Sequence, residues 1–215
     1  MTAKWKSGIM GLFLLVLVGA LLSGPLMSNV EHPEYVVIEK HKAIELRDYA
    51  PRIIAQVSVS GSREDSISTG FQQLADYIFG NNTTAATISK QEFISQDKTS
   101  KNQKIAMTAP VEQSLIDDTW IINFTMPSEY VITSLPKPNN AAVRLSEVPS
   151  QSFIAIKFSG INSASNINTH EKKLRAFALE NNIRIQRNPT YAFYNPPWTL
   201  PMLRRNEVMF QINNN

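Results

Sequence analysis

Few side chains in this sequence have the type and spacing that metal or acid-base chemistry requires. The three histidines, His32, His41 and His170, are too scattered to form a metal site of several imidazoles. His170 lies three residues after Ile167 and four before Leu174, so it borders the apolar face of a predicted helix. There it can ligate a haem iron or another metal, or it can pack beside the core. His41 is expected at the surface near the first strand.

A second chemical candidate is the stretch 191–212, YAFYNPPWTLPMLRRNEVMFQI. It combines aromatic rings, prolines and Met202 with the pair Arg204-Arg205. Such a set suits a flat amphipathic ligand such as a tetrapyrrole, because the macrocycle stacks on apolar surface while its propionates meet guanidinium groups. The same residues also fit a strand, a proline-rich loop and an edge strand with surface arginines.

Recognisable catalytic motifs are missing from the sequence. It contains no G-x-x-x-x-G-K, G-x-G-x-x-G, G-x-S-x-G or H-E-x-x-H pattern. The acidic pair Asp117-Asp118 is expected to form a solvated turn, since no histidine stands near it in the sequence. We therefore predict a protein that is not an enzyme; an enzymatic role would need a titratable constellation that the motifs do not display.

The charge balance argues against nucleic acid as a partner. The formal net charge is +3, but without Lys4 and Lys6 the basic residues exceed the acidic ones by only one. The longest basic clusters in the remainder are pairs, which is too little for a nucleic-acid surface. The chain has no cysteine, which excludes disulfides, thiolate metal sites and an acylated cysteine.

The N-terminus resembles a targeting or anchoring segment. Lys4 and Lys6 precede Gly8–Leu22, an uncharged and mostly apolar run. Residues 1–28 are either a cleaved signal peptide or an uncleaved anchor in which residues 5–27 cross the membrane. Both place the domain on the periplasmic or extracellular side, because the positive residues come first.

Periodicity along the rest of the chain predicts short strands and two helices. Residues 53–59 alternate between apolar and polar, as in a half-buried strand. Ile67, Phe71, Leu74 and Ile78 form one apolar stripe at helical spacing, with Asp65 or Ser66 as the predicted N-cap.

The second half repeats the order of the first. Residues 143–160 resemble 44–61, and the helices align at an offset of 100, with Leu74 matching Leu174. We predict two strand–strand–helix–strand–strand units, about 36–127 and 142–213. Together they form one α+β domain, a sheet curled into a distorted β-barrel flanked by two helices with pseudo-twofold symmetry.

Several short segments carry a family resemblance. KIAMTAPV (104–111) is a strand-like segment interrupted by a proline, and it is accompanied by IELRDY (44–49), LADYIFGN (74–81), YNPPW (194–198) and RRNEV (204–208). From Tyr35 to the C-terminus the chain resembles the SOUL family of haem-binding proteins. That resemblance implies the same pseudo-symmetric barrel and a non-enzymatic domain that binds haem non-covalently and reversibly.

The resemblance also nominates site residues. It implies a cleft beside the first helix, whose wall comprises Ile67, Phe71, Leu74, Ile78, Met107 and Tyr194. Some animal members have a histidine, proposed as an iron ligand, between the Arg and Tyr of an R-x-Y motif. The corresponding residue is Asp48 here, and Ser66–Gly80 carries no Lys or Arg. The iron ligand is therefore left unassigned.

The predicted organisation is a leader (1–28), a connector (29–34) and a SOUL-like domain (35–215). The leading hypothesis is an exported or membrane-tethered carrier, buffer or sensor that binds haem or a related tetrapyrrole. The alternative is a module of the same fold that senses another apolar small molecule or a protein partner.

Overall fold

The chain forms two helices packed on a curled antiparallel sheet. The computed structural model describes residues 30–84 and 102–213, and the predicted leader lies outside them. Within these ranges no helix is both long and apolar enough to cross a membrane. The elements are β1 (Tyr35–His41), β2 (Ile44–Tyr49), β3 (Arg52–Val59), α2 (Arg63–Ile78), β4 (Asn82–Thr83), β5 (Val111–Ile116), β6 (Thr119–Thr125), β7 (Lys137–Pro138), β8 (Arg144–Val148), β9 (Gln151–Phe158), α3 (Ala164–Glu180), β10 (Thr190–Phe193), η1 (Pro201–Leu203) and β11 (Asn206–Gln211).

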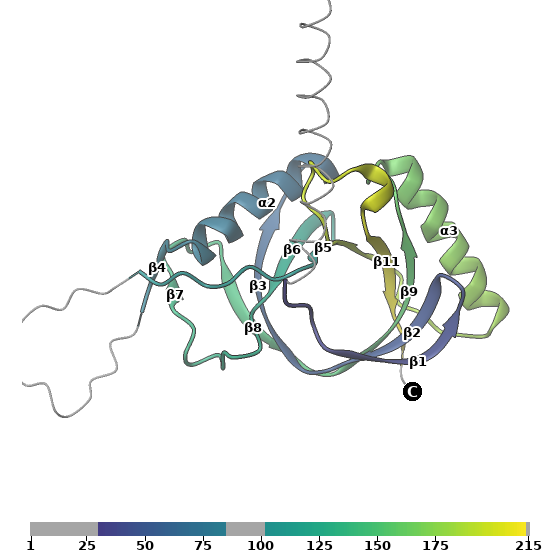
Figure 1. Cartoon of the computed structure of the whole chain (residues 1–215), viewed down its shortest axis with the longest axis horizontal. Helices are drawn as coiled ribbons and strands as arrows, with labels where there is room; N and C mark the ends of the chain where they lie inside the picture. Colours follow the sequence, from purple (N-terminus) through teal and green to yellow (C-terminus); the bar gives the residue numbers. More distant parts are fainter. Residues whose placement is uncertain (1–29, 85–101, 214–215) are drawn as a thin grey trace, which may run out of the picture.

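The strand order reveals how the two repeated units combine. The main sheet runs β1-β2-β9-β11-β10-β5-β6-β3-β8, with every pair antiparallel, and β4 pairs with β7 apart from it. The first strand of each unit pairs with the second strand of the other, β2 with β9 and β8 with β3. The predicted duplication and α+β class are confirmed. The pairing of β5 with β10 then joins the two parts into one curled sheet (Figure 1).

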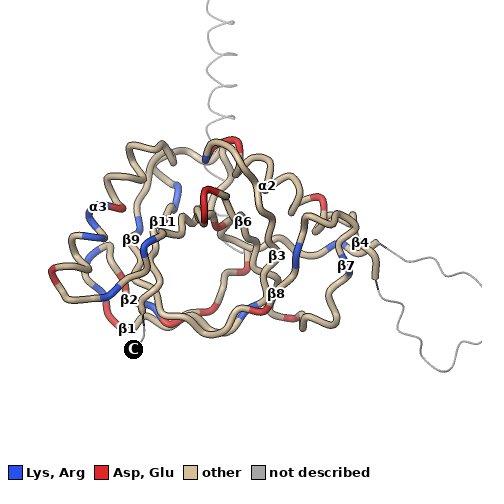
Figure 2. Tube along the Cα trace, turned by 180° about the vertical axis from the view of Figure 1, so that it is seen from behind, with Lys and Arg blue, Asp and Glu red and all other residues tan. Residues whose placement is uncertain are grey.

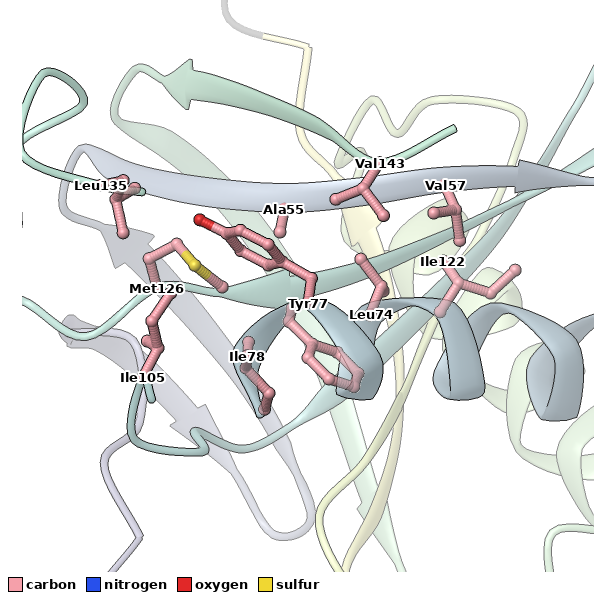
Figure 3. Close-up of a cluster of buried hydrophobic side chains, with 11 residues drawn as sticks. Ala55, Val57, Leu74, Tyr77, Ile78, Ile105, Ile122, Met126, Leu135 and Val143 are labelled. Atoms are coloured by element: carbon pink, nitrogen blue, oxygen red, sulfur yellow. The ribbon is translucent and has the colours of Figure 1, made fainter. Parts of the chain in front are cut away.

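Each helix covers one half of the outer face of the sheet. Under α2 the core contains Val57, Leu74, Tyr77 and Ile122, all essentially inaccessible (Figure 3). Under α3 it contains Ile154, Phe158, Leu174 and Phe210 among others. Because side chains of a strand alternate between faces, the intervening residues point into the concave interior.

Both helices begin at a serine, and the second cap is shifted by one residue relative to the alignment of the two helices. Ser62 caps α2 by accepting a hydrogen bond from the backbone N–H of Asp65, and Ser163 caps α3 in the same way through Asn166. The predicted cap at Asp65 or Ser66 was wrong by one turn. Asp65 lies in the first turn, where its carboxylate accepts from the Ser62 hydroxyl at 2.7 Å and complements the helix dipole.

Two turn predictions have different outcomes. Asp117 and Asp118 form the predicted turn: both have positive φ, and they join β5 to β6 as a two-residue hairpin loop. The segment 104–109, predicted to be strand-like, is an extended connection instead. Thr108 makes a single bridge to Glu31, and Pro110 follows a cis peptide bond before β5 begins at Val111.

Gly70 permits the close approach of α2 to β6. A Cβ added at this position would lie 2.7 Å from Cγ1 and 2.9 Å from Cβ of Ile122. We expect Gly70→Ala to lower the free energy of unfolding by about 1–3 kcal/mol, because overpacking outweighs the gain in helix propensity of about 1 kcal/mol. Urea unfolding, monitored by circular dichroism, measures this change in the free energy of unfolding.

Thr69→Ala on the exposed side of α2 is the matched control for Gly70→Ala, with an expected change within about 0.5 kcal/mol. Adding Ile122→Val to Gly70→Ala should recover part of the loss, since it shortens the side chain that the new Cβ meets. A Gly70→Ala protein as stable as the parent would show that α2 can shift away from the sheet at no cost.

Candidate ligand-binding site

An apolar cavity of about 590 Å³ opens beside the N-terminal half of α2. This volume is in the range of small-molecule and cofactor sites. Its walls come from α2, from the MTAPV segment and from the C-terminal turn, which crosses between the starts of the two helices (Figure 1). The lining residues are Val30, Ile67, Ser68, Phe71, Gln72, Met107, Thr108, Ala109, Val111, Asn162, Phe193, Tyr194, Asn195, Pro196, Pro197, Trp198, Arg204 and Asn206.

The polar groups of the lining mainly hold the surrounding loops in place. Arg204 is the one charged residue among those that line the cavity, and its guanidinium donates to the carbonyls of Thr199, at 2.7 Å, and Pro197. Asn206 donates to the carbonyl of Gly160 at 3.0 Å, and the amide oxygen of Asn195 accepts from the backbone of Arg205 at 2.7 Å. The wall is therefore apolar and its shape is fixed by side-chain-to-backbone hydrogen bonds.

The six nominated residues divide into two groups. Ile67, Phe71, Met107 and Tyr194 line the cavity. Leu74 and Ile78 do not: they are 0% and 1% exposed and lie in the core between α2 and the sheet (Figure 3). The first half of the helix stripe faces the cavity, and the second half faces β3 and β6.

The nominated wall took only Tyr194 from the second half of the chain, although the stretch 191–212 had the composition that suits a tetrapyrrole. Asn162, Phe193 and Trp198 contribute walls that no periodicity argument indicated. The segment YNPPW had been noted as characteristic of the family, yet only Tyr194 of it was nominated. The proline pair and the tryptophan in that segment were the available signal.

Tyr194 links the cavity to the concave interior of the sheet. Its ring lines the cavity with the guanidinium carbon of Arg205 at 3.8 Å from the ring centroid, and its hydroxyl donates to Glu207 Oε2 at 3.0 Å. Burial, reinforced by the Glu207 charge, raises the pKa of Tyr194 well above its ordinary value. The phenol therefore stays protonated and bonded to Glu207, which leaves it unsuited to binding iron as a phenolate.

Glu207 belongs to a buried ion network centred on Arg47. The Arg47 guanidinium donates to both Glu207 oxygens, at 2.7 and 3.0 Å, and to Glu45 Oε2 at 2.8 and 3.0 Å. Arg205 adds a contact to Glu207 at 2.8 Å from the rim of the network. Burial alone would raise the pKa of Glu207, but Arg47 and Arg205 outweigh it and hold that pKa below its ordinary value.

None of the three histidines is among the residues that line the apolar cavity. His32 lies against Tyr194 at 5.5 Å between ring centroids, and it is not among the residues that line the cavity. His41 is exposed and pairs with Glu39. His170 stacks on Phe158 at 4.1 Å and bonds the Asn166 carbonyl at 2.8 Å, so it packs beside the α3 core. Within residues 30–84 and 102–213, no group of three or more acidic or histidine side chains could hold a metal ion.

Two polar features lie apart from the apolar cavity: the carboxylate of Asp48 and a second cavity with a charged lining. Asp48 is exposed on β2 and accepts from Ser152 at 2.6 Å, remote from the apolar lining. The second cavity, of about 630 Å³, lies beside the connector and the start of β3. Glu31, Glu34 and Glu147 face Arg52 there, a mixed charge that does not suit the apolar face of a macrocycle.

The strand order and the two helices define the chain as a duplicated α+β half-barrel with an apolar cavity beside α2. Its sequence matches the family described as SOUL heme-binding protein over residues 30–211. The chain belongs to that family, which confirms the resemblance found in the sequence. No curated protein sequence matches the chain.

Solved structures share the architecture at low sequence identity. The EcmrR C-terminal domain is similar with a TM-score of 0.56 and 9% identity, over 80% of this chain and 98% of that one. A hydrolase from Listeria innocua is similar with a TM-score of 0.55 and 9% identity, over 82% and 94% of the two chains. EcmrR in a complex with DNA is similar with a TM-score of 0.56 and 8% identity, over 99% and 69%. At these identities the likeness shows the fold alone.

Proposed function

We propose that this chain binds haem or a related tetrapyrrole non-covalently in the cavity beside α2, as a carrier, buffer or sensor and not as an enzyme. One observation carries the proposal. The segments that mark the family, MTAPV and YNPPW, meet across space and line the same apolar cavity of about 590 Å³. Segments 83 residues or more apart in the chain thus form one site.

The lining offers more flat apolar surface for a macrocycle than it offers ligands for iron. Phe71, Trp198 and the Pro196-Pro197 pair offer flat apolar surface against which a porphyrin face can pack. No histidine is among the lining residues, and Tyr194 is committed to Glu207. Met107, whose thioether is the softest donor of the lining, is the candidate iron ligand. When bound, haem would supply ligand-binding and redox chemistry at its iron, while these residues hold its faces and exclude water.

We further propose that the domain is exported, or tethered to the membrane facing the periplasm or cell exterior. Support comes from the sequence: Lys4 and Lys6 precede the uncharged run Gly8–Leu22. Nucleic acid is not a partner in this proposal, because Lys and Arg are distributed over α3 and several strands with no single basic face (Figure 2).

Titration with hemin tests the binding proposal. The full chain is expected to shift the Soret band of hemin saturably at micromolar concentration. Absence of a saturable shift would overturn haem binding. Iron-free protoporphyrin IX is the informative comparison, since a cavity with no imidazole should bind it nearly as well as hemin.

A second function is favoured by the same missing imidazole. The cavity of a sensor for another apolar molecule needs flat apolar walls and no imidazole, and no histidine is among the lining residues. A chain that is insensitive to hemin but gains thermal stability with a different hydrophobic ligand would support this alternative.

Truncating the wall should weaken tetrapyrrole binding. Phe71 is 37% exposed and meets Phe124 edge-on at 5.5 Å between centroids, so Phe71→Ala removes accessible ring surface and little core. We expect Phe71→Ala and Met107→Ala to weaken hemin binding by roughly 2- to 10-fold, the value of one aromatic or methionine contact. His41→Ala on the far surface should leave it unchanged. An equal loss at His41 in the hemin titration would contradict this ranking.

A further inference from the structure

The cavity mouth is bordered by an exposed apolar patch, which we call the mouth rim: Ile161, Trp198, Met202 and Leu203. These side chains are 47–76% exposed. They form one surface because the two segments that carry them are hydrogen-bonded, Gly160 N–H to the Pro201 carbonyl at 2.8 Å. Residues 195–203 contain no charged side chain. A tryptophan beside aliphatic side chains, with no charge among them, is the composition that favours the membrane interface.

The described part of the chain begins in the lining of this same cavity. Val30, the first described residue, lines the cavity. The uncharged run ends at Leu22, eight residues earlier. Eight residues span at most about 29 Å when fully extended. If the run lies in a bilayer, the mouth of the cavity is held within that distance of it.

We propose that the mouth rim docks on a phospholipid bilayer, so that the cavity opens toward the lipid phase and takes its apolar ligand from there. The inference deepens the proposed function and rests on its membrane tether. Two independent observations agree on the orientation: the position at which the apolar run reaches the domain, and the exposed uncharged patch around that position.

Other exposed apolar side chains provide contrasts. Leu179 is 81% exposed, but it lies at the far end of α3, about 22 Å along the helix from the start near the rim. Ile38 is exposed on the edge strand β1, where Glu39 and Lys40 follow it directly. Val36 and Val37 beside Ile38 are also exposed, but neither this run of β1 nor Leu179 lines the cavity, so neither should contact lipid.

Spin labels at single cysteines test the docking, since the chain has no cysteine of its own. The full chain carrying Met202→Cys, Leu179→Cys or Ile38→Cys, labelled with a nitroxide, is reconstituted into phosphatidylcholine vesicles. At position 202 collisions with oxygen should exceed those with a water-soluble nickel complex, as in lipid. At positions 179 and 38 collisions with the nickel complex should exceed those with oxygen, as in water. All three are exposed positions, so the labels should leave the fold intact.

Three outcomes would overturn the proposal. A label at 202 as accessible to nickel as the one at 179 would show a solvated rim. A label at 202 shielded from both reagents would indicate a second copy of the chain covering the rim. Lipid contact at 38 in place of 202 would show that the edge strand docks. The measurement needs no haem, so its failure is distinguishable from a failure of hemin binding.

Discussion

Arg47→Ala is expected to lower the free energy of unfolding by about 3–5 kcal/mol, among the largest effects of any single substitution in this chain. The Arg47 side chain is fully buried and makes four hydrogen bonds to the carboxylates of Glu45 and Glu207. Its removal leaves the inaccessible Glu207 with one ion pair, to Arg205, and the hydrogen bond from the Tyr194 hydroxyl. Chemical denaturation monitored by fluorescence measures the loss.

Lys40 provides a matched control within the same network. It pairs with Glu45 at 3.1 Å, but its side chain is 63% exposed. Lys40→Ala should therefore cost no more than about 1 kcal/mol. Replacing both buried partners, Arg47→Met with Glu207→Met, should be less destabilising than the sum of the single changes, because neither charge is left unpaired. If the losses of stability from Arg47→Met and Glu207→Met were additive, a direct buried pairing of Arg47 with Glu207 would be contradicted.

The same network predicts a pH dependence. The pKa of Glu207 is lowered in the folded state, so its ionised pairing stabilises the fold above the pKa that it has when unfolded. That contribution is lost as the pH falls through the folded-state pKa. The stability difference between the parent and Glu207→Gln should therefore be largest near neutral pH and narrow on acidification. If the stability difference between the parent and Glu207→Gln grew on acidification, the lowered pKa of Glu207 would be contradicted.

Ser68→Trp is expected to weaken hemin binding by about 10- to 100-fold, the equivalent of 1–3 kcal/mol of steric conflict. Ser68 is exposed on α2, yet it lines the cavity, so a bulky side chain there occupies ligand space while leaving the core intact. The hemin titration gives the affinity, and thermal unfolding without ligand checks that the domain remains folded.

Thr69→Trp is the control for this experiment. Thr69 is the next residue of α2 and is equally exposed, but it does not line the cavity. It should leave hemin affinity within about twofold of the parent, less than 0.5 kcal/mol. If Ser68→Trp and Thr69→Trp behaved alike, the ligand would bind outside the cavity.

The fold could be predicted in most respects because its signals are local or repeated. Alternation in residues 53–59 gave a strand, and the stripe from Ile67 to Ile78 gave a helix, confirmed as parts of β3 and α2. The match between residues 143–160 and 44–61 gave the duplication. The helix start was missed because Ser62, Asp65 and Ser66 are all acceptable caps, and only the backbone decides which one receives a helix N–H.

The candidate site could be predicted only in part. Ile67, Phe71, Leu74 and Ile78 share one stripe, and periodicity cannot tell which of them lie over the sheet and which extend beyond it. In the structure Leu74 and Ile78 are sealed against β3 and β6, while Ile67 and Phe71 line the cavity. The opposite wall comes from a turn more than 120 residues further along the chain, which no local pattern connects to α2.

The sequence by itself determined the elements, the two repeated units, the family and the apolar N-terminal run, because each is written in spacing, composition or short motifs. Tertiary structure alone decided that β2 and β8 exchange between the units and that β5 pairs with β10, and these pairings together make one sheet of the two units. It also brought Arg47 to Glu207, 160 residues apart, and set Val30 and Trp198 around one cavity. Such long-range pairings depend on how the sheet curls, and that follows from the packing of the whole chain.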